Sequence, residues 1–205
     1  MKLTATLFVI AYSTSLSFGQ NDSSYYNLIY NQIRNHQRTG TIYYADKPYN
    51  EFNKQAFEPL YKNPVVNIFG SKNKASITLT KQEREYILSQ LQNFPNEILS
   101  DSLLPNSKRI AIGGIQKFVR KANESIYDSL INLHDTVAAY QFLSSSFMHS
   151  SFFFSKPIYI RNNTIVLSCF TWLVGNSWAG TSELCFYKKE NNHWVKWITV
   201  TRGDY

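Results

Sequence analysis

Apolar side chains recur every three or four residues near the start of the chain, a spacing that predicts a helix. In the stretch NDSSYYNLIYNQIRNHQ, the positions that share one helical face are Tyr26, Ile29, Tyr30 and Ile33. A short polar side chain among residues 22–24 can cap the start of this helix, and Gly40 ends it. The run TIYYA at 41–45 then predicts a short strand.

A central helix is predicted from the stretch TKQEREYILSQLQN. Its first residues form a capping box, in which the Thr80 hydroxyl accepts from an early backbone amide and the Glu83 carboxylate reaches back. The buried face of this helix then consists of Ile87, Leu88 and Leu91.

The middle of the chain has a less regular pattern. Residues 98–122 contain a strand-like run that is interrupted by Gly113 and Gly114. Residues 124–143 allow one or two helices, with Asp135 as a cap for the second.

Four runs in the last part of the chain are rich in β-branched and aromatic residues, which predicts four strands. They read FFFSKPIYI, TIVLSCFTWLV, SELCFYKK and WVKWITVT. Two of the connections, 161–164 and 190–193, are short turns with Asn, which tolerates the positive φ of tight hairpins. The second run is apolar on both alternating faces, so it is interior to the sheet. Pro157 in the first run fits an edge strand, where its missing amide donor does no harm.

These elements predict an α+β fold in which N-terminal and central helices pack on a C-terminal four-stranded antiparallel meander. The chain has 205 residues, enough for one well-packed domain and too few to favour two. We therefore expect a single α+β domain over residues 20–205.

Residues 1–19 have the form of an export signal. Lys2 gives a positive start, the run LFVIAY is apolar, and the small residues Ser17 and Gly19 precede a cleavage point. The apolar run is shorter than the ~20 residues that a membrane anchor needs, and no later run is long and apolar enough to span a bilayer. We expect a mature chain that begins at Gln20, is secreted or periplasmic, and has no transmembrane segment.

The formal net charge of the chain is +7, and its basic residues are scattered rather than gathered in a dense tract. In an exported protein this balance suits an anionic polymer or another envelope protein as partner, and nucleic acid is not expected. The simpler explanation of the charge is solubility, which we favour. Tyrosine and tryptophan are abundant, and both suit surfaces that bind sugars, peptides or proteins.

The only two cysteines, Cys169 and Cys185, flank the run FTWLVGNSWAGTSEL. If the turn between them is centred on Ser177, they lie directly opposite each other, close enough for a disulfide after a local twist. An oxidising exterior preserves such a bond, and we therefore expect it. A shift of one residue in register would put the two thiols on opposite faces and leave them as buried free cysteines.

The tip of the same hairpin supplies the candidate binding residues, Asn176, Ser177 and Trp178. An exposed indole offers a stacking face and a hydrogen-bond donor; the alternative is an indole that folds back onto the sheet. Ser177 is not a catalytic candidate, because its Gly-x-Ser-x-x-Gly context differs from the nucleophile elbow and no histidine is spaced to serve as its base. We predict no catalytic residue.

The remaining candidate chemistry is sparse. The four histidines are far apart and form no metal motif, so no metal or cofactor is expected: His36, His134, His149 and His193. Glycoside hydrolysis would need two carboxylates that meet in a cleft, and the candidates are Glu83, Glu85, Glu97 and Asp101. The chain also holds three N-glycosylation patterns, at Asn21, Asn123 and Asn162, and an Arg-Gly-Asp tripeptide at 202–204.

Three stretches together resemble a loose group of small secreted bacterial proteins. They are LTKQEREYILSQL, FSKPIYIRNNTIVL and LCFYKKENNHWVKW, and the likeness covers mainly residues 79–91 and 152–197. Proteins of this group end in a Ser-x-Pro strand and a tight hairpin that bears a Trp. The resemblance implies an exported bacterial protein and transfers no catalytic residue.

The sequence therefore favours a non-enzymatic binding or interaction module of the cell envelope or exterior, whose ligand is unknown. The alternative is a hydrolase that acts on an envelope polysaccharide or peptide through carboxylates that the sequence does not pair. An inhibitor or immunity-type protein is a third possibility.

Overall fold

The computed structural model describes residues 23–38, 40–48, 65–67, 75–92, 98–101, 103–143, 148–175 and 179–204. Within these residues the helices are α1 (Ser23–His36), α4 (Lys81–Gln92), α5 (Ile115–Asn132) and α6 (Thr136–Phe142). The strands are β1 (Ile42–Ala45), β2 (Val65–Asn67), β3 (Ser76–Thr78), β4 (Ser107–Ile110), β5 (Ser151–Phe154), β6 (Ile158–Ile160), β7 (Ile165–Leu173), β8 (Gly180–Glu190) and β9 (His193–Asp204).

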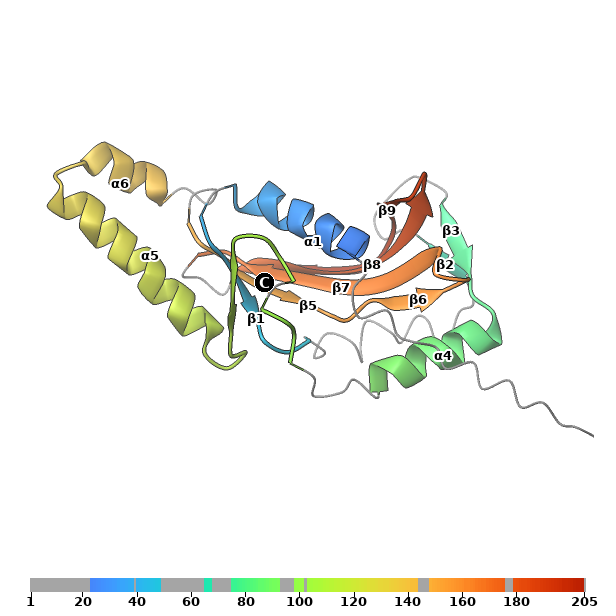
Figure 1. Ribbon diagram of the computed structural model, residues 1–205. Helices are drawn as coiled ribbons and strands as arrows, with labels where there is room; N and C mark the ends of the chain where they lie inside the picture. The colour runs from blue at the N-terminus through green and yellow to red at the C-terminus, as the bar shows by residue number, and fades with distance from the viewer. Residues whose placement is uncertain are drawn as a thin grey trace, which may run out of the picture.

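Seven of these strands form one mixed sheet, in the order β4-β1-β5-β7-β8-β9, with β6 paired to β7 beside β5. β1 runs parallel to both β4 and β5, and the remaining pairs are antiparallel (Figure 1). The predicted α+β class is confirmed, but the predicted four-stranded antiparallel meander is wrong. The N-terminal strand β1 and the central strand β4 extend the sheet through parallel pairs.

The first of the four predicted C-terminal strands is two strands in the structure. β5 and β6 are separated at residues 155–157, and both pair with β7. Pro157 lacks an amide donor and lies in this break, so it ends the ladder instead of occupying an edge strand. β5 is not an edge strand, because β1 lies on its other side.

The sheet is covered on both faces, and β7 shows this most clearly. Its alternate residues Val166 and Phe170 pack in the cluster that contains α1, whereas Leu167 and Cys169 pack in the cluster that contains α4. α1 contributes Tyr25, Ile29 and Ile33, none of which is exposed. Figure 1 shows α1 along one face of the sheet, with α4 on the opposite side.

α5 covers the end of the sheet that is formed by β1 and β5. Ile115 and Val119 from its first half pack with Ala45 and Phe153 in a third cluster of buried side chains. The second half of α5 extends past the sheet and forms a hairpin with α6, as Figure 1 shows. Asp135 caps α6 by accepting a hydrogen bond from the amide of Ala138 at 2.9 Å, which confirms the predicted cap.

The predicted disulfide between Cys169 and Cys185 is not formed, and both cysteines are free. Cys169 pairs with Leu184 and Cys185 pairs with Ser168, so the register differs by one residue from the one that the disulfide requires. Because successive side chains of a strand point to opposite faces, the two thiols lie on opposite sides of the sheet. Burial raises the pKa of Cys169 to about 12 and that of Cys185 to about 11, so both are inert apolar core residues.

The predicted capping box at the start of α4 is confirmed. The amide of Thr80 donates to Oε2 of Glu83 at 2.8 Å, and the amide of Glu83 donates to Oγ1 of Thr80 at 3.1 Å. Arg161, from the turn after β6, also donates to Oε1 of Glu83 at 2.8 Å and to the carbonyl of Thr78 at 2.7 Å. Glu83 therefore joins α4 to the sheet, and the hydrogen bond from Arg161 lowers the pKa of its carboxyl.

We predict that Glu83→Gln lowers the free energy of unfolding at neutral pH by about 1–2 kcal/mol, because it weakens both the cap and the ion pair. A carboxylate whose pKa is depressed in the folded state stabilises above its unfolded pKa of about 4.3, and this stabilisation is lost as the pH falls through the folded pKa. The difference between wild type and variant should therefore shrink in acid. Urea unfolding followed by circular dichroism at several pH values measures it.

Glu85→Gln is the matched control, because within the described residues the Glu85 carboxylate makes only an exposed ion pair with Lys81, at 3.8 Å. We expect it to change the free energy of unfolding by less than about 0.5 kcal/mol. Equal effects of the two substitutions would contradict the role of Glu83.

Candidate functional site

An open pocket of about 360 Å³ lies between α5, α6 and the segment that leads into β5. Its lining residues are Asn123, Glu124, Tyr127, Asp128, Phe142, Leu143 and Met148. The volume is at the lower end of the range of small-ligand sites in proteins. A ligand group in this pocket would therefore be a side chain or a small molecule rather than a polymer strand.

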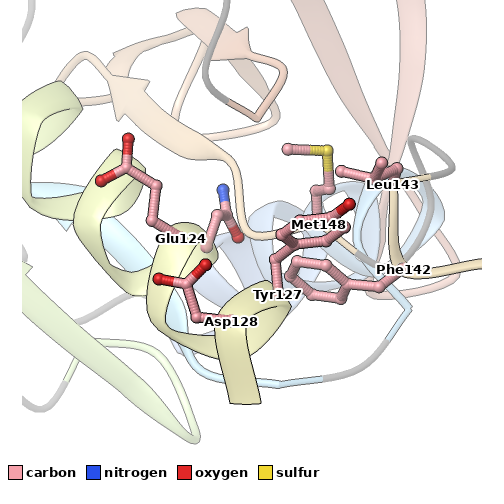
Figure 2. Close-up of a pocket in the computed structure, with 7 residues that line it drawn as sticks. Glu124, Tyr127, Asp128, Phe142, Leu143 and Met148 are labelled. Atoms are coloured by element: carbon pink, nitrogen blue, oxygen red, sulfur yellow. The ribbon is translucent and has the colours of Figure 1, made fainter. Parts of the chain in front are cut away.

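The pocket has one acidic side and one apolar side. Glu124 and Asp128 are one helical turn apart on α5, and both are exposed. Neither carboxylate has an ion pair or hydrogen bond within the described residues. Figure 2 shows both on the helix, with the Tyr127 side chain between them and the group of Phe142, Leu143 and Met148. This arrangement can accept a cation that is carried on an apolar stem.

The floor of the pocket is fixed by a buried amide. Asn123 is 1% exposed, its Nδ2 donates to the carbonyl of His149 at 3.0 Å, and its Oδ1 accepts from the amide of His149 at 2.8 Å. Gln37, at the end of α1, accepts from the amide of Ser150 at 3.0 Å. These bonds tie α5 and α1 to the start of β5, and they place Met148 in the pocket wall.

The ring of His149 packs edge-on against Tyr43, with ring centroids 5.1 Å apart. Burial lowers the pKa of His149, so the ring is neutral at neutral pH and adds no charge beside the pocket. Gly40 has a φ of +80°, and a Cβ there would lie 2.6 Å from Cε1 of His149. Only glycine fits at this position, which lies four residues after the end of α1 at His36.

The hairpin around the pocket exposes an unusual amount of apolar surface. Eight large hydrophobic residues are exposed among the described residues, and five of them lie between residues 131 and 143. They are Ile131, Leu133, Val137, Tyr140 and Leu143. α6 buries Ala139 and Phe142 on one side and exposes Val137 and Tyr140 on the other. Grouped exposed apolar residues of this kind are typical of interaction sites.

The predicted binding residues Asn176, Ser177 and Trp178 lie outside the described residues. Gly175, which precedes them, has a φ of +54°, and a Cβ there would lie 2.7 Å from Cε of Met148. The end of β7 therefore approaches the pocket wall. Ligand binding by these three residues stays a prediction.

The carboxylates that the sequence offered for hydrolysis have other partners. Glu83 binds Arg161, Glu85 pairs with Lys81, and Nε of Arg109 lies 2.9 Å from Oδ1 of Asp101. Glu97 lies outside the described residues. The three described carboxylates are thus held in three separate ion pairs.

A second charged group lies on β8 and β9. Glu183 pairs with Lys196 at 2.6 Å and lies 3.9 Å from Arg202, and Arg202 also pairs with Asp204 at 3.2 Å. The Arg-Gly-Asp tripeptide lies at the end of β9, and its two charged side chains form an ion pair with each other. Each carboxylate of this group already has a cationic partner, so the group stabilises the β8–β9 pairing.

His36 stacks on Trp172 beside this charged group, with ring centroids 3.9 Å apart. Burial lowers the pKa of His36. No group of three or more His, Cys, Asp or Glu side chains in the described part of the chain is arranged to hold a metal ion. None of the helices described here is long and apolar enough to cross a bilayer.

Sequence reasoning missed every residue of the pocket except Asn123, which it recognised only as a glycosylation pattern. The buried position of Asn123 makes a glycan on its side chain incompatible with this fold. One signal was available: Glu124, Asp128 and Asp135 lie in a stretch, 122–155, that contains no lysine or arginine. Comparisons of the chain with protein-family models, curated proteins and solved structures found no match.

We predict that Asn123→Ala lowers the free energy of unfolding by about 2–4 kcal/mol, because it leaves the buried backbone amide and carbonyl of His149 without partners. Urea unfolding measures this change. Asn132→Ala is the matched control, since Asn132 is exposed near the end of the same helix. The role of Asn123 is refuted if the two variants are equally stable.

Proposed function

We propose that the protein is an exported, non-enzymatic binding module whose interaction surface is the α5–α6 hairpin with its pocket. The observation that carries this proposal is the coincidence of exposed apolar side chains with two carboxylates that have no partner among the described residues. Apolar groups contribute affinity when they leave water, and unpaired charges at the rim select the partner.

The ligand group that fits is a primary amine or a guanidinium on an apolar stem, such as a lysine or arginine side chain of a protein partner. The carboxylates of Glu124 and Asp128 would bind the charged head, and Phe142 and Leu143 would contact the stem. An anionic polymer, which the net charge of the chain suits, would be repelled at this pocket. Such a polymer would have to bind elsewhere on the molecule.

A hydrolytic role for this pocket is the alternative, and its chemistry argues against it. Acid–base catalysis by two carboxyls needs environments that hold one protonated and the other ionised. Glu124 and Asp128 are both exposed, and they lie on the same side of one helix. Two such groups share one environment, which favours binding of a cation over proton transfer.

The proposal that the protein is exported is supported by the signal-like residues 1–19 and by the resemblance to secreted bacterial proteins. We predict that the protein recovered from outside the cytoplasm begins at Gln20, as measured by intact mass. The double substitution Leu7→Arg/Val9→Arg should prevent cleavage, because it interrupts the apolar run. A full-length chain in the same extracytoplasmic fraction would contradict cleavage.

We predict that n-hexylamine binds the pocket with roughly millimolar affinity, because it carries an ammonium on an apolar stem. Amide chemical shifts of Tyr127, Asp128 and Met148 should move on titration. The double variant Glu124→Gln/Asp128→Asn should abolish the change, since it removes both negative charges.

Two controls separate this binding from general effects. Hexanoate has the same apolar stem with the opposite charge and should not bind, and Glu85→Gln changes an exposed carboxylate on α4 that should not matter. Equal responses to hexylamine and hexanoate, or an unchanged response in the double variant, would remove the support for this surface.

A further inference from the structure

The outward face of α5 carries a stripe of four charged residues. Lys117, Lys121, Glu124 and Asp128 are spaced four, three and four residues apart, so they follow one line along the helix. This line is opposite the buried residue Val119 and all four side chains are exposed. None of the four has an ion pair or a hydrogen bond within the described residues.

The order of these charges is unfavourable for an isolated helix. Lys117 and Lys121 are one turn apart and repel each other, and Glu124 and Asp128 do the same. The basic pair lies in the N-terminal half and the acidic pair in the C-terminal half, which is opposite to the preference of the helix dipole. Lys121 and Glu124, three residues apart, are the one attractive pair along the stripe. A partner that presents the charges in the reverse order would therefore offset the two repulsions.

The stripe is complementary to itself when reversed. In an antiparallel pair of α5 helices, one register faces Lys121 with Glu124 of the other copy and also Lys117 with Asp128. Both pairs are centred on the same point, between Ala122 and Asn123. A two-fold axis through that point would therefore form four ion pairs, two of each kind.

Two exposed apolar residues flank the helix and take no part in this register. Ile112, just before α5, is 37% exposed, and Leu133, just after it, is 77% exposed. Leu133 follows Lys117 by sixteen residues, about 160° around the helix, so it lies on the side away from the stripe. Figure 1 shows α5 at one end of the molecule, beside α6.

We propose that a second copy of this chain is a partner of the α5–α6 hairpin, bound through antiparallel α5 helices about a two-fold axis. This inference rests on the proposed function, because the lysines of the second copy supply the cationic group that Glu124 and Asp128 accept. The net charge of +7 makes two copies repel each other overall. The attraction therefore depends on this local register, and the dimer is a weak one.

A charge-exchange experiment on the mature chain tests the register. Lys121→Glu places two carboxylates opposite each other, and Glu124→Lys places two ammonium groups opposite each other. Each single variant should weaken dimerisation about tenfold or more, and the double variant Lys121→Glu/Glu124→Lys should recover most of it. Sedimentation equilibrium over a range of concentrations measures the association constant, and circular dichroism verifies folding.

The matched controls are Lys81→Glu and Glu85→Lys on α4, which change the net charge by the same amounts. They should not reproduce the losses. Lys117→Glu and Asp128→Lys form a second exchange pair, which keeps the test valid if a variant at 121 or 124 does not fold.

A wild-type chain that stays monomeric at the highest soluble concentration overturns the dimer. So does a dimer that the exchange variants leave intact, or a loss that neither double variant restores. The binding function stands or falls separately: hexylamine binding that depends on Glu124 and Asp128 would survive the failure of the dimer.

Discussion

The burial of both faces of β7 is the constraint on which the rest of the structure depends. The first seven residues of this strand, 165–171, are all buried, so the chain must cover the sheet on two sides. α1 covers one side, and α4 and α5 cover the two ends of the other. Because a slip of one residue would exchange the two faces, the same constraint fixes the β7–β8 register and separates Cys169 from Cys185.

Local patterns made part of this fold predictable. The apolar spacing of α1, the Thr80–Glu83 box and the alternation in β7 are each contained within a dozen residues, and all three elements appear in the structure. The fully buried face of α1 is Tyr25, Ile29 and Ile33, however, and the predicted Tyr26 and Tyr30 are only half-buried. The parallel pairs are different, since β1 pairs with residues 107–110 and 151–152, far along the chain. No local pattern specifies such partners, because the pairing depends on how whole layers cover the sheet.

The candidate pocket could not be predicted from local patterns either, because its residues come from separate elements that only the fold brings together. Its acidic side comes from α5, its apolar wall comes from α6 and Met148, and the bond between Asn123 and His149 holds the two together. Asn123 has no apolar or catalytic signature, so the sequence did not single it out as a structural residue. The sequence does show that residues 122–155 contain no lysine or arginine. Only the α5–α6 hairpin, however, brings the acidic residues of this stretch next to its apolar ones.

α5 shows how the fold leaves room for such a surface. Ile115 and Val119 anchor its first half, and burial of each contributes about 1.5–3 kcal/mol. The two like-charge pairs on its outward stripe cost about 0.2–0.5 kcal/mol each. The anchored end therefore outweighs the unfavourable charges, and the second half of the helix is not needed to cover the sheet. Asn123 lies at the boundary between these halves, so the buried amide that secures the core also sets the position of the carboxylates.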